Sequence, residues 1–189
     1  MINNIKNIYL YFMLGMFGYS SISNLLYPYF ETHKQFDIQD YSTIMTASAI
    51  GLIVGGILHY FIKISAKYKY IIAVLVYFMI NSINAVLVYL PFELMVISYF
   101  IYGILSINSY NIRQTTTQVY IPSSIRGRIN GVFTIFNSFA MIIGGLLCMI
   151  LVNYLSISFI IFLFSSFGIL GAFKFILFGK KDVEKIYNL

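Results

Sequence analysis

The sequence predicts an all-α integral membrane protein with six transmembrane helices, and three observations lead to that prediction. The chain of 189 residues is 60% hydrophobic and only 10% charged, whereas a soluble domain of this size carries about 25% charged residues. The apolar residues gather into six stretches, each close to the roughly 20 residues that cross a bilayer. The basic residues collect in every second connection, the pattern that sets the orientation of a membrane protein.

The six stretches define the domain organisation. The transmembrane domain is expected over residues 1–178, with a charged tail over residues 179–189, and the spans cover about residues 8–29, 41–62, 70–90, 94–112, 129–153 and 158–178. Pro28 is expected at the outer end of the first span, because proline does not continue a helix. A signal peptide competes for this first stretch, since Gly18 and Ser20 resemble part of a small-residue cleavage region. The single lysine ahead of the stretch and the spans that follow argue against it.

The basic residues indicate the orientation in the membrane. With both termini in the cytoplasm, Lys34 alone lies outside, and eleven basic residues lie inside: Lys6, Lys63, Lys67, Lys69, Arg113, Arg126, Arg128, Lys174, Lys180, Lys181 and Lys185. This asymmetry predicts a multi-pass protein of the plasma membrane with cytoplasmic termini. The net charge of +6 is therefore expected to face the lipid bilayer surface, and no nucleic-acid partner is expected.

A short basic hinge separates the fourth and fifth spans. Pro122 must end or bend the preceding helix, and Arg126 and Arg128 belong at a membrane surface because an arginine at the bilayer centre costs about 3 kcal/mol. Gly127 and Gly131 are expected to let the chain turn tightly and a neighbouring helix approach. Arginine's planar fork could hold helix-end carbonyls or a carboxylate, so the two arginines are predicted to form a cytoplasmic latch. Simple anchoring at the membrane surface remains the alternative.

The pattern Pro122-x3-Arg126-Gly127-Arg128-x2-Gly131 between the fourth and fifth of six spans resembles the C-terminal half of a major facilitator superfamily transporter. The closest resemblance is to the drug, macrolide and siderophore exporters, and residues 49–56 resemble the eighth helix of that group. The loop at residues 63–69 departs from the group, because it is basic but lacks the acidic residue and glycines usual there.

This resemblance implies a half-bundle of the fold that exports a small amphipathic or apolar solute, such as a drug, by alternating access. A complete member has twelve spans, so a second six-span half is the implied partner. It would be a separate chain or, less favoured, a second copy of this one.

Small residues recur every four positions on two of the spans. Ala47, Gly51 and Gly55 share one face of the second span, and Ala140 and Gly144 share one face of the fifth. Small residues at this spacing let helix backbones meet closely. Static packing and a seam that slides during transport need the same surface, so both interpretations stay open.

Polar and adaptable side chains are the candidates for a solute cavity. The resemblance implies that the first, second, fourth and fifth spans line the central cavity, where the candidates are Ser20, Asn24, Asn108, Asn111, Phe133, Asn137 and Met141. Hydrogen bonding between helices is the alternative role for each polar residue. For Asn81 and Asn84 helix pairing is favoured, because the third span is peripheral in the family.

Nothing in the sequence suggests catalysis, a metal or a cofactor, so the protein is not expected to be an enzyme. His33 and His59 have no second histidine or carboxylate at ligand spacing. Cys148 is the single cysteine, so no intrachain disulfide forms. No carboxylate falls inside a predicted span, although proton coupling generally uses an intramembrane ionisable group. Such a group is therefore expected in the other half.

Two functional classes remain open. The first is one half of a secondary exporter, which would transport nothing by itself. The second is a membrane protein that does not transport, either an embedded partner or the remnant of a disrupted transporter gene. An intramembrane enzyme is the least favoured class, because no nucleophile and base are paired in the sequence.

Overall fold

The computed structural model describes residues 2–62 and 64–189. The described residues form helices and no strands, in the order α1 (Ile2–Thr32), α2 (Ile38–Phe61), α3 (Ala66–Val86), the short 3₁₀ helix η1 (Leu87–Tyr89), α4 (Phe92–Tyr120), α5 (Ser123–Leu151), α6 (Ile157–Gly171), the π-helical turn η2 (Ala172–Leu177) and α7 (Lys180–Tyr187). The predicted all-α fold is confirmed.

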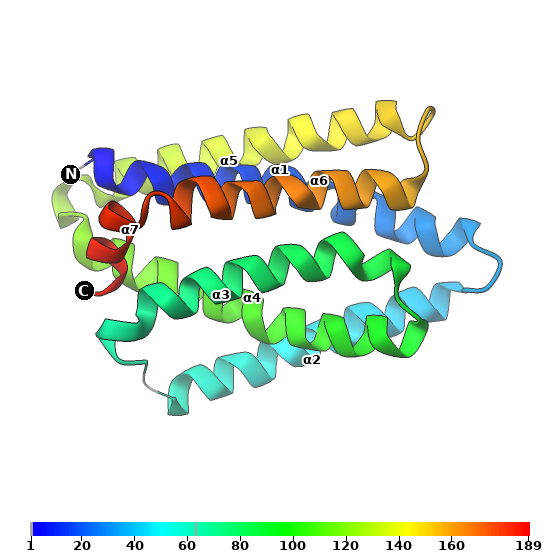
Figure 1. Cartoon of the computed structure of the whole chain (residues 1–189), viewed down its shortest axis with the longest axis horizontal. Coiled ribbons are helices and arrows are strands. Elements are labelled where there is room, and N and C mark those ends of the chain that lie inside the picture. The colour runs from blue at the N-terminus through cyan, green and yellow to red at the C-terminus, as the bar shows by residue number, and fades with distance from the viewer. Residues whose placement is uncertain (1, 63) are drawn as a thin grey trace.

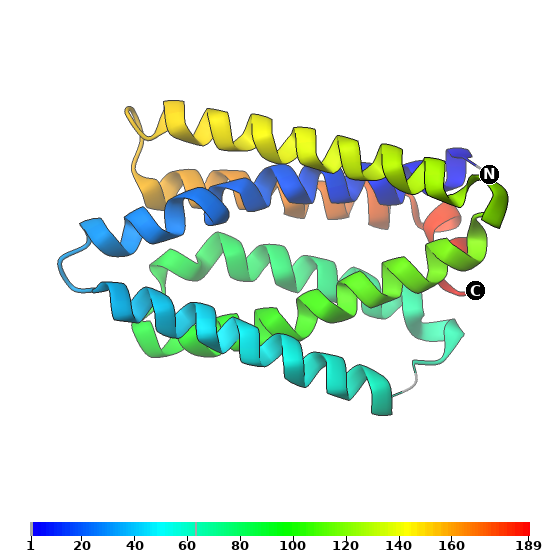
Figure 2. The same ribbon diagram turned by 180° about the vertical axis from the view of Figure 1, so that it is seen from behind.

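Six long helices run side by side, and both termini lie at the same end of the bundle (Figure 1). α1 packs between α5 and α6, α2 packs along α4, and α3 lies against α4 and α6; Figure 2 shows the same arrangement from behind. We call the end that carries both termini the basic end, because Lys6, Arg126 and Arg128 lie there. The opposite end carries the connection that holds Asp37 and Asp40, and we call it the acidic end.

The long helices have the size and composition of membrane spans. Among the described residues, five are long and apolar enough to cross a bilayer: α2, α3 with η1, α4, α5 and α6 with η2. α1 is not one of these five, and its sequence contains repeated tyrosine, serine and glycine residues. It is nevertheless 31 residues long and packs along α5 and α6, so it completes a bundle of six.

Local sequence signals explain where the helices begin. The Asp37 carboxylate accepts hydrogen bonds from the backbone N–H groups of Gln39 and Asp40, and the Asp40 carboxylate accepts one from the Asp37 N–H. This reciprocal cap starts α2. Pro91 and Pro122 directly precede α4 and α5, where a proline costs no helical hydrogen bond.

Two boundaries differ from the sequence prediction. Pro28 lies inside α1, which continues to Thr32, because the first span still has a full turn of helix-compatible residues after it. α4 does not stop near residue 112 but continues to Tyr120, which moves Arg113 from the expected connection into a helix. The charged tail over residues 179–189 contains a helix, α7.

Glycines set the closest helix contacts. A methyl group at Gly51 would collide with the carbonyl oxygen of Phe100, and one at Gly55 would lie 2.8 Å from the Cα atom of Ile104, so both glycines pack directly on the α4 backbone. Gly144 of α5 packs in the same way on Ser20 of α1. Small residues allow this close approach without a polar or bulky contact between helices.

The hinge between α4 and α5 is shorter than the sequence suggests. The turn consists of Ile121 and Pro122, whose backbones are extended. The Arg126 guanidinium donates from Nε and Nη2 to the Ile121 carbonyl, at 3.3 and 3.1 Å. Gly127 and Gly131 lie inside α5, and among the described residues nothing outside their own helix approaches within 4 Å of where their side chains would be. Ile121 and Pro122 therefore turn the chain, and the expected turning role of these two glycines is corrected.

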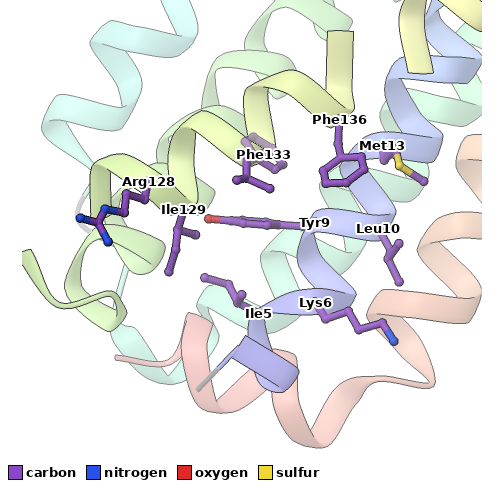
Figure 3. A pocket seen from close by; sticks show the side chains of 10 residues that line it. Ile5, Lys6, Tyr9, Leu10, Met13, Arg128, Ile129, Phe133 and Phe136 are labelled. Atoms are coloured by element: carbon purple, nitrogen blue, oxygen red, sulfur yellow. The ribbon is translucent and has the colours of Figure 1, made fainter. Parts of the chain in front are cut away.

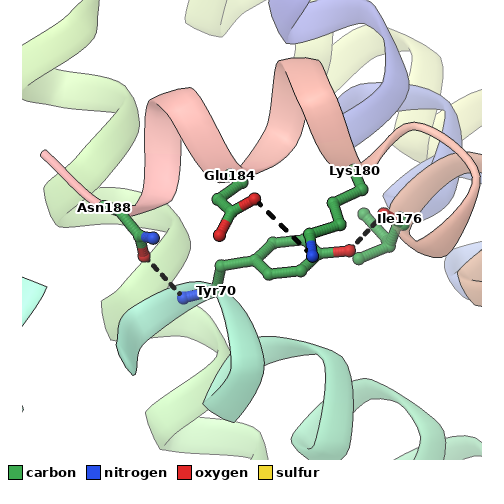
Figure 4. Close-up of polar contacts among 5 residues, drawn as sticks. All are labelled: Tyr70, Ile176, Lys180, Glu184 and Asn188. Carbon is green, nitrogen blue, oxygen red and sulfur yellow. Dashed lines mark hydrogen bonds and ion pairs between the residues drawn. The ribbon is translucent and has the colours of Figure 1, made fainter. Parts of the chain in front are cut away.

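The C-terminal helix folds back onto the basic end of the bundle (Figure 4). Its buried face consists of Val183, Ile186 and Tyr187, each fully buried. The Asn188 side-chain oxygen accepts a hydrogen bond from the Tyr70 N–H at 3.0 Å, and the Tyr70 hydroxyl donates to the Ile176 carbonyl at 3.1 Å. The apolar face of α7 thus covers α3 at the basic end of the bundle.

Candidate functional site

A cavity of about 340 Å³ lies among α1, α3, α4 and α5, and we call it the polar cavity. Most of its lining is aromatic or aliphatic, with a few convergent polar groups, which is the usual composition of a small-molecule site. The lining residues are Tyr11, Phe12, Gly15, Met16 and Tyr19 of α1, Ile80, Asn81 and Asn84 of α3, Tyr102, Ser106, Ser109, Tyr110 and Arg113 of α4, and Phe133 of α5.

Two asparagines of α3 form the back wall of the cavity. Asn81 donates from Nδ2 to the Tyr11 hydroxyl at 3.2 Å and to the Tyr77 carbonyl at 2.7 Å, and its Oδ1 lies directly against Gly168 of α6. Asn81 therefore joins three helices. Asn84 is only 4% exposed, and its Oδ1 is buried with no hydrogen-bond partner among the described residues, so the side chain must turn toward the cavity before this acceptor meets a ligand.

A positive charge lies at the other end of the cavity. Arg113 is 8% exposed, and its guanidinium carbon lies 5.0 Å from the centre of the Phe12 ring, 4.7 Å from that of Phe133 and 5.4 Å from that of Tyr110. Rings from three helices thus surround the cation, a favourable arrangement in a desolvated site.

A second, almost wholly apolar groove of about 490 Å³ lies between α1 and α5 at the basic end (Figure 3). Tyr9 and Met13 enter it from α1, and Phe133 and Phe136 enter it from α5. The centre of the Phe133 ring lies 4.3 Å from that of the Tyr9 ring, with the two rings tilted by 39°. Phe133 also borders the polar cavity, so it separates the two spaces. The groove offers little to orient a solute, which makes the polar cavity the better candidate site.

The comparison with known families settles what kind of bundle this is. The sequence profile of the Major Facilitator Superfamily matches residues 8–187, nearly the whole chain. The chain belongs to the major facilitator superfamily. No curated protein and no solved structure matches it. This major facilitator chain is therefore a multi-pass membrane protein from a family of secondary transporters, and its six-helix bundle corresponds to one half of that fold.

Of the two cavity candidates of α1, Ser20 lies in a helix contact and Asn24 is exposed beside it, and their role in a cavity between two halves stays a prediction. Ser20 is fully buried against Gly144 of α5, and its hydroxyl donates to the Phe17 carbonyl at 2.6 Å. Asn24 is exposed and donates from Nδ2 to the Ser20 carbonyl at 2.7 Å. Neither residue lines the polar cavity of this major facilitator half-bundle.

Of the two asparagines predicted for α4, Asn108 faces α2. Asn108 Oδ1 lies 3.0 Å from His59 Nδ1, and its Nδ2 donates to the Ile104 carbonyl at 2.7 Å. This contact gives His59 the partner that sequence spacing does not reveal, and it ties α2 to α4. Asn111 lies half-buried three residues further along α4 and outside the polar cavity.

Of the three candidates on α5, one lines the polar cavity and two do not. Phe133 lines the polar cavity. Asn137 donates from Nδ2 to the Phe133 carbonyl at 2.9 Å, while its Oδ1 is buried without a partner among the described residues. Met141 is half-buried and lies outside the cavity. Within the described part of the chain, no cluster of three or more His, Cys, Asp or Glu side chains has a metal-binding arrangement.

Two polar residues of the cavity lie where the sequence does not predict a site. The peripheral position of the third span favours helix pairing for Asn84, yet Asn84 lines the cavity. The sequence prediction places Arg113 in the basic connection, yet Arg113 lies in α4 and also lines the cavity. One signal was present: residues 111–121 contain no proline or glycine, so the helix has no reason to stop before Pro122.

Proposed function

We propose that this chain is one half of a secondary exporter that carries a small amphipathic solute across the plasma membrane by alternating access. The observation that carries the proposal is the polar cavity, a space of about 340 Å³ with an aromatic wall and a few unpartnered polar groups. Aromatic rings and methionine adapt to solutes of several shapes. The basic end, with both termini, faces the cytoplasm in this proposal, as the asymmetry of basic residues supports.

The proposed direction is outward. Its support is the Pro122…Arg126-Gly127-Arg128 pattern, which resembles that of drug, macrolide and siderophore exporters. The proposed partner is a second six-helix half. Large apolar side chains of α5 such as Phe136, Phe139 and Ile142 are each more than half exposed, and a second half would cover part of such a face. Family sites lie between two bundles that rock against each other.

Flux measurement on reconstituted protein tests the proposal. The chain is purified and placed in liposomes, alone and after co-expression with an N-terminal six-helix half of the family, and the movement of an anionic and a cationic fluorescent dye is followed. We expect flux only from the paired halves. Proton-coupled flux from this chain by itself would refute the half-transporter proposal, and absence of flux from a stable pair would favour the non-transporting class.

A matched pair of phenylalanines links any flux to the cavity. Phe133→Ala removes a cavity wall, and we expect it to lower the flux at least tenfold. Phe162 lies on α6, is 43% exposed and does not line the cavity, so Phe162→Ala should leave the flux within about twofold of the parent. Equal effects of the two substitutions would show that the polar cavity is not the route of the solute.

A further inference from the structure

The charge in the polar cavity lies well inside the bundle. Arg113 is seven residues before the end of α4 at Tyr120, which is about 10 Å along a helix that rises 1.5 Å per residue. It is 8% exposed, so it does not simply reach water at the helix end. A buried arginine that stays charged needs an anionic partner or a dense set of acceptors, because removing one partner from a buried ion pair costs about 3–5 kcal/mol.

The described residues place no anionic side chain beside Arg113. Glu31, Asp37, Asp40 and Glu93 lie at the acidic end, and Asp182 and Glu184 lie on α7. Within the described residues the one ion pair joins Glu184 to Lys180, at 4.0 Å, and no carboxylate pairs with Arg113. The positive charge in the cavity is therefore uncompensated in this chain.

The surroundings of the guanidinium leave its edge free for an anion. The Phe12, Phe133 and Tyr110 rings stabilise the cation but accept no conventional hydrogen bond. Its Nε–H is buried with no acceptor among the described residues, so an anion in the cavity is expected to meet the terminal N–H groups of the guanidinium first. An arginine carries five N–H donors in a planar fork that matches a carboxylate or phosphate with two parallel hydrogen bonds. A ring-bound arginine with an unused edge is arranged to receive such a group.

The residues at the far end of the cavity determine which groups the ligand can carry away from Arg113. Tyr102 precedes Arg113 by eleven residues on α4, about 16 Å along the helix, and Asn84 and Tyr102 both line the cavity. The unpartnered Oδ1 of Asn84 can accept one hydrogen bond. Between this acceptor and Arg113 the wall is largely aromatic and aliphatic.

We propose that the polar cavity binds an amphipathic organic anion, with its carboxylate or similar oxyanion on Arg113 and its apolar body against Phe12 and Phe133. Where the anion has a hydrogen-bond donor at its other end, that donor reaches Asn84. The inference rests on the proposed function only in treating this ligand as the transported solute. It narrows the solute from any amphipathic molecule to an anionic one.

Binding of matched naphthyl probes to the purified full-length chain tests the inference. The probes are 2-naphthoate, the neutral 2-naphthylmethanol and the cationic 2-naphthylmethylammonium, which share one aromatic body. The chain contains no tryptophan, so the anisotropy of naphthyl fluorescence excited above 300 nm reports the probe alone. We expect 2-naphthoate to bind at least tenfold more tightly than the alcohol, and the ammonium probe to bind most weakly.

Two substitutions locate the preference. Arg113→Gln should reduce the affinity for 2-naphthoate to that for the alcohol. Arg128 is exposed and borders only the apolar groove, so Arg128→Gln should leave the tenfold preference intact. If Arg113→Gln does not fold, Arg113→Lys serves instead. It keeps the charge but loses the planar fork, and 2-naphthoate should bind at least threefold more weakly while the alcohol is unaffected.

Each contrary result overturns the inference. The inference fails if the parent chain binds 2-naphthoate no more tightly than the alcohol, or if substitution of Arg113 leaves the preference for 2-naphthoate unchanged. It also fails if Arg128→Gln loses as much of this preference as Arg113→Gln. Because binding is measured without flux, the two proposals fail separately. Naphthoate binding through Arg113 without transport refutes only the transport proposal, and transport without charge preference refutes only this inference.

Discussion

Replacement of Ile186 by alanine tests how α7 is held on the bundle. Ile186 is fully buried, and an eight-residue helix is not stable by itself in water, so packing must supply its stability. An isoleucine-to-alanine change in a core costs about 2–5 kcal/mol. Since 1.4 kcal/mol is a factor of ten, even the lower bound raises the undocked fraction of α7 about thirtyfold.

Hydrogen–deuterium exchange with mass spectrometry measures this fraction directly. Exchange of the backbone amides of residues 180–189 follows the local opening of the helix, so the Ile186→Ala chain should exchange there about thirtyfold faster or more. Exchange in α2, at the far side of the bundle, should stay unchanged. The matched control is Leu189→Ala, because Leu189 is 49% exposed and only its carbonyl is used, as the acceptor for Lys69. Equal exchange in the parent and Ile186→Ala would refute docking by packing.

Three further outcomes are expected. Gly55→Ala should lower the melting temperature of the detergent-purified chain, because the added methyl group meets the α4 backbone at a cost of about 1–3 kcal/mol. Gly56→Ala is the matched control, since a methyl group there meets open space and should be neutral or slightly stabilising. Similar effects of the two substitutions would contradict the packing described. Tyr187→Phe removes a hydroxyl contact of 2.6 Å with Tyr77 and should cost about 1 kcal/mol, seen as a fall of about 2–4 °C in melting temperature, and no fall would show that the contact is not stabilising. A cysteine at Lys67 should react with a membrane-impermeant reagent only in opened cells; labelling of intact cells would overturn the proposed orientation.

The polar residues show the limit of reading the chain by helix faces. Ser20 and Asn24 do share a face, but that face meets Gly144 of α5, and a spacing of four says nothing about which neighbour a face meets. Asn108 and His59 are 49 positions apart, and their contact depends on how α2 slides along α4. The interatomic distances come from the register between helices, which local sequence does not encode.

The sequence by itself determined the membrane class, the all-α fold, the number of long helices and the family, because bilayer thickness and the cost of a charge in hydrocarbon act on each segment separately. Only the tertiary structure decided which polar groups meet. Asn84 and Arg113 come from different helices and become one cavity when α1, α3, α4 and α5 pack together. The charged tail became a docked helix for the same reason. Its apolar residues are buried only when α1, α3 and α4 are assembled beside them at the basic end, a condition that no single segment contains.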